Sequence, residues 1–267
     1  MIQNGTLQAA DNTALGSLPG GAVTITNGGT FDVGGNTTAN NANFGTKQFN
    51  IAGAGVGGNG AIIDSSSASQ EDAFENIVLT TNATVGGPTR WDMRNGVPEL
   101  NLAGFTLTVT NTSLIALVGV DVTPGNILIE PGSSLAFELT CNVTGAGTLS
   151  VSNGAFLGLY ESPLGSITRS IVLNGGGITN LSGPGEAAYL DAPVLMAAGS
   201  TLGSSSLNTA IYDGVISDGG NGFSLTSLGF GTNILTAPKL SSPTHSALEP
   251  ENGMARPDIL NAALLVT

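Results

Sequence analysis

A short phrase recurs along this chain, and its recurrence constrains the fold more than any other feature. The phrase is a glycine pair or a Gly-X-Gly, followed by alternating apolar and hydroxyl side chains. It occurs at residues 28–33 (GGTFDV), 145–151 (GAGTLSV) and 199–203 (GSTLG). A strand-and-turn unit that repeats without intervening helices is typical of a β-solenoid. We therefore expect an all-β protein built from stacked coils.

The composition favours a folded chain over a disordered one. The 267 residues include 40 glycines and only 9% charged residues, but 40% of the residues are hydrophobic. Disordered chains usually combine low hydrophobicity with high charge density. Aromatic residues make up only 5% of the chain, so Val, Ile, Leu and Ala must fill the core, which suits narrow stacked layers.

Candidate strands follow one another, separated by Gly, Asn, Pro and Ser turns. Most alternate between apolar residues and Thr, Ser or Asn, which indicates strands half buried against one core. At about 20 to 25 residues per coil and about 4.8 Å between coils, the repeat would form on the order of ten coils and a rod of about 50 Å. We predict strands at residues 22–26, 30–33, 48–52, 61–64, 76–80, 90–93, 100–102, 106–110, 114–118, 126–130, 134–139, 148–151, 156–160, 170–173, 210–216 and 223–228.

The chain divides into two parts by its pattern. Residues 1–237 carry the repeat and are predicted to form the solenoid. Residues 238–267 contain four prolines and the single histidine, His245, and are predicted to form a non-repeat tail, either a cap on the stack or a partly disordered extension. Helical character is predicted at residues 256–265 and for one turn at residues 68–74. We also expect the segment 64–99 to leave the stack as a loop.

Charge and cysteine content argue against several partners. A net charge of -13 repels phosphate backbones and anionic membrane surfaces, so nucleic acid is not an expected partner. No run of 18 apolar residues predicts a membrane-spanning helix. Cys141 is the only cysteine, which excludes an intramolecular disulfide, and we expect it to be a small core side chain. The first residues carry no signal-peptide pattern, and the repeat begins at once, as in a segment cut from a longer protein.

Residues 5–16 (GTLQAADNTALG), followed by residues 23–33 (VTITNGGTFDV), closely resemble the passenger-associated, or autotransporter-associated, β-strand repeat. The resemblance extends over most of the chain before the tail as many weak matches, so its strength is cumulative. It implies a right-handed parallel β-helix, exported to the bacterial cell surface or secreted, and adhesin-like. Further similar stretches lie at residues 60–64, 76–79, 90–94, 102–108 and 214–220.

The densest polar cluster contains the only tryptophan. On a strand, Arg90, Asp92 and Arg94 would share one face, with Trp91 on the other side and Glu99 nearby. One interpretation is a ligand-binding site for a carbohydrate or an acidic sugar. The other is an ion pair between coils on the outer wall, with Trp91 in the core or anchoring a loop; such pairs contribute little when exposed.

Catalysis and metal binding have weaker support. Glycosidase chemistry needs two carboxyl groups on either side of the scissile bond, and sequence cannot show that any pair converges. A lyase needs a basic proton acceptor, and the chain has only six Lys and Arg residues.

The glycine runs at 57–60 and 219–222 lack the aspartate spacing of a calcium-binding β-roll and are predicted to be turns. Threonine pairs such as Thr24 and Thr26 suit an outward strand face and form no regular ice-binding array. Carboxylates that the coil period could stack are Asp64, Asp92, Asp121 and Glu130, or Asp213 and Asp218.

The sequence therefore predicts a non-enzymatic, structural or adhesin-like β-helix module of a secreted or cell-surface bacterial repeat protein. It would bind a glycan or a surface protein through strand faces or loops, without a cofactor or metal. One alternative is a carbohydrate-active β-helix enzyme that uses the cluster around Asp92. A second alternative is an inert stalk spacer.

Overall fold

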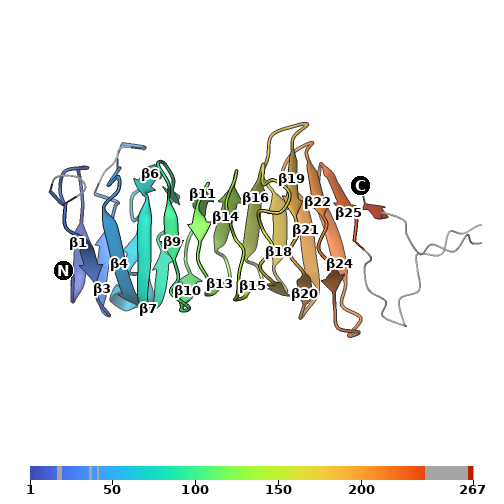
Figure 1. The fold of residues 1–267 in the computed structure, drawn as a ribbon, viewed down its shortest axis with the longest axis horizontal. Coiled ribbons are helices and arrows are strands. Elements are labelled where there is room, and N and C mark those ends of the chain that lie inside the picture. The colour runs from blue at the N-terminus through green and yellow to red at the C-terminus, as the bar shows by residue number, and fades with distance from the viewer. Residues whose placement is uncertain (17–19, 36–37, 41, 238–263, 267) are drawn as a thin grey trace, which may run out of the picture.

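The computed structural model describes residues 1–16, 20–35, 38–40, 42–237 and 264–266. They form a β-solenoid of about ten turns, in which coils of short parallel strands stack along one long axis (Figure 1). The predicted fold class is therefore confirmed. The one helical element in the described part is the 3-10 turn η1 (Val56–Gly58).

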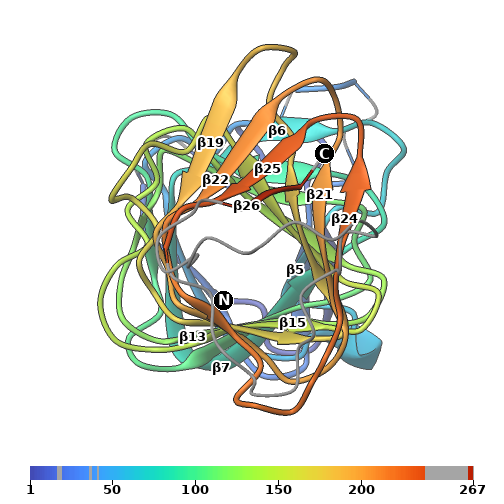
Figure 2. The same cartoon turned by 90° about the vertical axis from the view of Figure 1, so that its right-hand side faces the viewer.

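Three walls surround a common interior when the solenoid is viewed along its axis (Figure 2). The first wall belongs to the 14-stranded sheet, and its strands pair in parallel with the equivalent strands of the coils before and after. Its ten strands are β1 (Gly5–Gln8), β3 (Gly29–Asp32), β5 (Ile62–Ile63), β7 (Asn76–Gly86), β10 (Thr106–Val109), β13 (Asn126–Ile129), β15 (Leu149–Ser152), β17 (Ile171–Asn174), β20 (Val194–Met196) and β23 (Ile216–Ser217).

The second wall is the eight-stranded sheet, which carries the predicted polar cluster. Its strands follow one another in parallel from coil to coil. They are β6 (Gln70–Phe74), β8 (Trp91–Met93), β11 (Ile115–Val118), β14 (Ser134–Glu138), β16 (Phe156–Tyr160), β18 (Gly177–Asn180), β21 (Ser200–Ser204) and β24 (Leu225–Gly229).

The third wall begins as a branch of the 14-stranded sheet and ends as the four-stranded sheet. Strand β7 belongs to both walls, because its first half pairs with β4 and its last residues pair with β5. Isolated bridges at Asp121↔Asn142 and Val143↔Ile167 continue this wall between the two sheets. Its other strands are β2 (Val23–Ile25), β4 (Gln48–Gly53), β9 (Glu99–Asn101), β12 (Asp121–Val122), β19 (Ala187–Leu190), β22 (Thr209–Tyr212), β25 (Thr232–Leu235) and β26 (Leu264–Val266).

The coil length is close to the expected one, with one exception. On the first wall Leu107 pairs with Ile127, Ile127 with Leu149, and Leu149 with Ile171, so these coils have the length that the repeat predicted. Phe31 instead pairs with Ile62, and the longer coil between them includes strand β4 and η1. The extra residues beyond the regular coil length therefore lie between Phe31 and Ile62. They do not lie in the segment 64–99, where a loop was expected.

Alternation on each strand builds the core. Inward positions are filled by Ile, Leu and Val over most of the length, and aromatic rings gather towards the N-terminal end. Phe74 lies at the centre of this aromatic group, with its ring centroid 4.8 Å from that of Phe49 and 5.2 Å from that of Trp91. Both contacts are edge-to-face, the arrangement that aromatic quadrupoles favour.

The helical turn predicted at residues 68–74 is wrong. Residues Gln70–Phe74 form strand β6, which pairs with β8 through Gln70↔Trp91 and Phe74↔Met93, with a register shift between them. Packing of Phe74 in the aromatic group overrides the helical propensity of the Gln-Glu-Asp sequence. The segment 64–99 likewise contains strands of the stack and is not a loop excursion.

The predicted tail lies mostly outside the described residues. Its described part, β26 (Leu264–Val266), pairs antiparallel with β25. The helix predicted over residues 256–265 is therefore wrong at its last two positions, while residues 256–263 lie outside the described part. In the described ranges, no helix is long and apolar enough to cross a membrane.

Candidate functional site

Three of the predicted site residues meet on the outer face of the eight-stranded sheet. Arg90 and Asp92 form a bidentate ion pair, in which Arg90 Nε and Nη2 donate to Asp92 Oδ1 and Oδ2, each over 2.8 Å. Arg94 Nη2 also donates to Asp92 Oδ2. Strand alternation around β8 therefore places these three side chains together, as the sequence predicted.

Two further carboxylates come from other strands. Arg90 Nη2 lies 3.1 Å from Oε1 of Glu138, the last residue of β14, and Arg94 Nη2 lies 3.7 Å from Oε2 of Glu71 on β6. We call Glu71, Arg90, Asp92, Arg94 and Glu138 the charged cluster. Sequence reasoning missed both glutamates. Stacking by the coil period could have indicated Glu138, which lies two coils beyond Arg94.

The charged cluster is enclosed rather than open. The side chain of Asp92 is 0% exposed, while those of Arg90 and Arg94 are about a quarter exposed. Burial raises the pKa of Asp92 and of Glu138 above their ordinary values, and the neighbouring arginines oppose that rise. Both oxygens of Asp92 are engaged by guanidinium groups, so this carboxylate is not free for acid–base chemistry. The contacts of Arg90 with Glu138 and of Arg94 with Glu71 link different coils.

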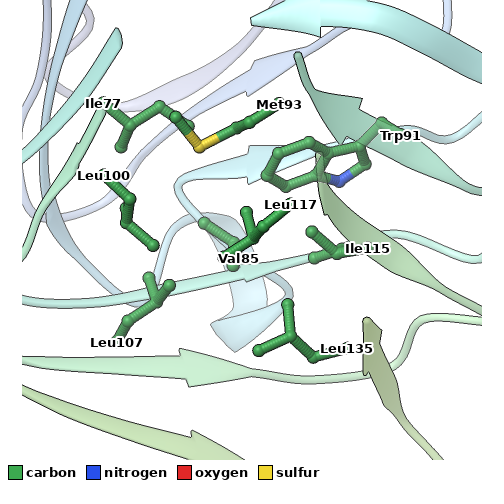
Figure 3. Close-up of a pocket in the computed structure, with 9 residues that line it drawn as sticks. All are labelled: Ile77, Val85, Trp91, Met93, Leu100, Leu107, Ile115, Leu117 and Leu135. Atoms are coloured by element: carbon green, nitrogen blue, oxygen red, sulfur yellow. The ribbon is translucent and has the colours of Figure 1, made fainter. Parts of the chain in front are cut away.

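Trp91 points the other way, into the core (Figure 3). It is 1% exposed, and its indole Nε1 donates to the carbonyl of Gly86 over 3.0 Å. It lines a void of about 10 Å³, together with Val85, Met93 and six other apolar side chains. A void of this size with no polar lining does not hold an ordered water. Trp91 is thus a core residue and cannot contact a ligand on the outer face.

Glu99 does not join the cluster. It is the first residue of β9 on the third wall, where it pairs with Asn76 and Asp121. Among the described residues, no ion pair links Glu99 to either arginine.

A hollow lies further along the same outer face. It has a volume of about 330 Å³ and spans strands β14, β16 and β18. Its lining consists of Ser113, Leu114, Ser134, Phe156, Gly158, Thr179 and Leu181, none of them charged.

The floor of the hollow follows from the register. Asp92 pairs with Ala116, Ala116 with Ala136, Ala136 with Gly158, and Gly158 with Thr179. One outward column of the sheet thus passes from the charged cluster through the smallest side chains into the hollow. A Cβ on Gly158 would lie 2.5 Å from Leu181 Cδ1, so a larger residue there would displace the wall of the hollow.

Phe156 and three hydroxyl-bearing residues line the hollow. The Phe156 side chain is 42% exposed, which is unusual for a ring on a sheet face. It leans over Gly177, where a Cβ would lie 3.0 Å from the ring atoms Cδ1 and Cε1. Within the described ranges no hydrogen bond occupies the hydroxyls of Ser113, Ser134 or Thr179. Sequence reasoning missed this site, because its members lie on separate coils.

Asp218, Glu130 and Asp121 are each engaged in separate local hydrogen bonds. Asp218 accepts hydrogen bonds from the backbone N–H groups of Gly220, Gly222 and Phe223, which lowers its pKa. Glu130 accepts one from the Thr110 hydroxyl, and Asp121 accepts one from Asn142. Over the described residues, no group of three or more His, Cys, Asp or Glu side chains could hold a metal ion.

Cys141 is buried, as predicted, and lies just beyond β14. Its thiol is 1% exposed and donates to the carbonyl of Leu117 over 2.8 Å. Burial raises the pKa of the thiol to about 11, so it is protonated at neutral pH and unreactive as a nucleophile.

Comparison of the chain with protein-family models, with curated proteins and with solved structures finds no match in any of the three.

Proposed function

We propose that this chain is a non-catalytic, adhesin-like β-helix module of a secreted or cell-surface bacterial repeat protein. It binds its partner through the outer face of the eight-stranded sheet. The observation that carries this proposal is the uncharged hollow of about 330 Å³ on that face, beside the charged cluster. A concave site with apolar walls and a few hydroxyls is the usual form of a small binding site.

The enclosure of Asp92 argues against catalysis at the charged cluster. A glycosidase needs one carboxyl group able to donate a proton and a second able to attack or to activate water. Asp92 is 0% exposed and held by two arginines, and Glu138 is engaged by Arg90. The carbohydrate-active enzyme with Asp92 at its centre is therefore the less supported alternative, and the inert spacer does not account for the hollow.

The experiment uses the whole chain on an array of neutral and acidic glycans and on glycan-free proteins. Release of reducing ends and of unsaturated sugars is assayed in parallel. Binding without product supports the adhesin-like module. Product release that Asp92→Ala abolishes overturns it in favour of the enzyme, and absence of all binding overturns it in favour of the spacer.

A further inference from the structure

We infer that the hollow on the outer face of the eight-stranded sheet binds a neutral saccharide unit, with Phe156 as its stacking platform. This inference rests on the proposed function and names the ligand class of that site. Charge, hydrogen bonding and shape each support the same ligand class.

Charge excludes ionic recognition inside the hollow. None of its seven lining residues is charged. Both arginines of the charged cluster are engaged by carboxylates, and the chain carries a net charge of -13. An acidic sugar would find no free cation there and would meet repulsion from the whole molecule. The ligand that fits is uncharged.

Hydrogen bonding separates a saccharide from an extended peptide. A peptide strand gains most of its affinity from main-chain hydrogen bonds at a sheet edge. The hollow lies in the middle of a sheet, where β16 pairs with β14 on one side and with β18 on the other. Its backbone groups are therefore already engaged. The available groups are the hydroxyls of Ser113, Ser134 and Thr179, each able to donate and to accept.

Shape completes the match. A pyranose ring combines an apolar C–H face with hydroxyls around its rim. The half-exposed ring of Phe156 and the side chains of Leu114 and Leu181 offer an apolar surface, with hydroxyls beside it. The small residues Gly158 and Ala136 leave the space that a sugar ring needs between these walls.

Fluorescence gives a direct test, because Trp91 is the only tryptophan and is 1% exposed. In Phe156→Trp, the added indole is the only one at the surface, so a saccharide that stacks on it shifts and quenches its emission. The probes are neutral tetrasaccharides of glucose, galactose, mannose and N-acetylglucosamine. A saturable change with at least one probe in Phe156→Trp, and none in the wild-type protein, is expected.

Affinity measurements on the glycan array locate the site independently. Phe156→Ala and the triple variant Ser113→Ala/Ser134→Ala/Thr179→Val should each weaken binding by about tenfold or more. The matched controls are Leu195→Ala, whose side chain is 46% exposed on β20, and Thr108→Val on β10; both should bind as the wild type does.

The outcomes distinguish this inference from the proposed function. Glycan binding that survives both hollow variants overturns the inference and leaves the adhesin-like module standing. Binding only to acidic glycans, or to proteins after periodate destruction of their sugars, also overturns the inference of a neutral saccharide and leaves the adhesin-like module standing. Absence of any binding overturns both.

Discussion

Arg90 and Glu138 form an ion pair across an intervening strand. Arg90 precedes β8 and Glu138 ends β14, and β11 lies between these two strands. Strand β11 presents two outward residues beside this pair: Ala116, opposite Asp92, and Val118, opposite Glu138. We expect the guanidinium group to cross β11 over Ala116, the smaller of the two. One long side chain thus connects three successive coils.

This arrangement predicts that the size of the side chain at position 116 determines whether the ion pair between Arg90 and Glu138 can form. In Ala116→Leu, the added side chain occupies the path of Arg90, and the contact with Glu138 is lost. Glu138→Gln should therefore destabilise the wild-type protein by about 1 kcal/mol and the Ala116→Leu variant by much less. A double-mutant cycle in urea measures this coupling, and additive effects would contradict the bridge.

Asp92 should be the most sensitive member of the charged cluster. Asp92→Ala leaves two guanidinium groups without their shared carboxylate. We expect a loss of about 2 to 3 kcal/mol in the free energy of unfolding, less than for a fully buried pair, because both arginines are about a quarter exposed. Glu99 lies outside the charged cluster, so Glu99→Ala should change the free energy of unfolding by no more than about 0.5 kcal/mol. If both substitutions changed the free energy of unfolding equally, the charged cluster would not contribute specifically to stability.

Arg169 is predicted to hold a corner of the solenoid. It is 1% exposed, and its Nη2 donates to the carbonyls of Val122, Thr123 and Thr144 over 2.8 to 3.0 Å. Burial lowers the pKa of its guanidinium group. Arg169→Lys keeps a charge but loses the planar fork, so we expect a loss of about 2 to 4 kcal/mol and faster hydrogen exchange in these corners. A lysine variant as stable as the wild type would show that a single ammonium group can serve these carbonyls as well as the guanidinium group does.

Asp64 gives a pH-dependent prediction. Its Oδ2 is buried and has no partner in the described part of the chain, and its Oδ1 accepts from the backbone N–H and hydroxyl of Ser66. Burial raises the pKa of Asp64 above its ordinary value of 3.8. The stability that Asp64 contributes is therefore full below pH 3.8 and is lost as the pH rises through the folded-state pKa.

Asp64→Asn cannot ionise, so it should gain stability over the wild type as the pH rises from about 3.5 to 7, on the order of 1 kcal/mol. Thermal unfolding of both proteins across this pH range measures the difference. A difference that stays constant with pH would show that ionisation of Asp64 does not matter.

Asp218 should make stability depend on pH in the opposite direction to Asp64. Three backbone N–H groups at Gly220, Gly222 and Phe223 stabilise its carboxylate and lower its pKa below 3.8. The contribution of Asp218 is present above pH 3.8 and is lost as the pH falls through the lowered value. Hydrogen exchange at Gly222 should accelerate only in strong acid, whereas in Asp218→Ala it should be fast at every pH.

The sequence allowed prediction of the solenoid but not of its register. The repeated phrase opens strands on two different walls, β3 and β15 on the first and β21 on the second, so recurrence revealed the unit without assigning its wall. The predicted strand at residues 210–216 is in fact divided between β22 and β23. Apart from β6 and β26, where a helix was expected, the strands that were not predicted are β1, β12, β18, β19, β20, β21 and β25. Around β18 and β19, glycines and alanines hide the alternation.

The candidate sites depend on that register. Alternation alone predicted that Arg90, Asp92 and Arg94 share one face, because the three residues follow one another along a single strand. The partners Glu71 and Glu138 and the lining of the hollow come from other coils. Because the coil that ends at Ile62 is longer than those that follow Leu107, a fixed period cannot assign neighbours between coils.

The aromatic group at the N-terminal end affects how unfolding can be observed. Phe31, Phe44, Phe49, Phe74 and Trp91 all lie within the first coils, and beyond them the core is largely aliphatic. In a one-dimensional array each coil contacts only its neighbours, so distant coils can melt separately. Trp91 is an optical reporter for one end of the rod, while far-ultraviolet circular dichroism averages over its whole length. The separation between the two melting curves therefore measures how far cooperativity extends along the stack.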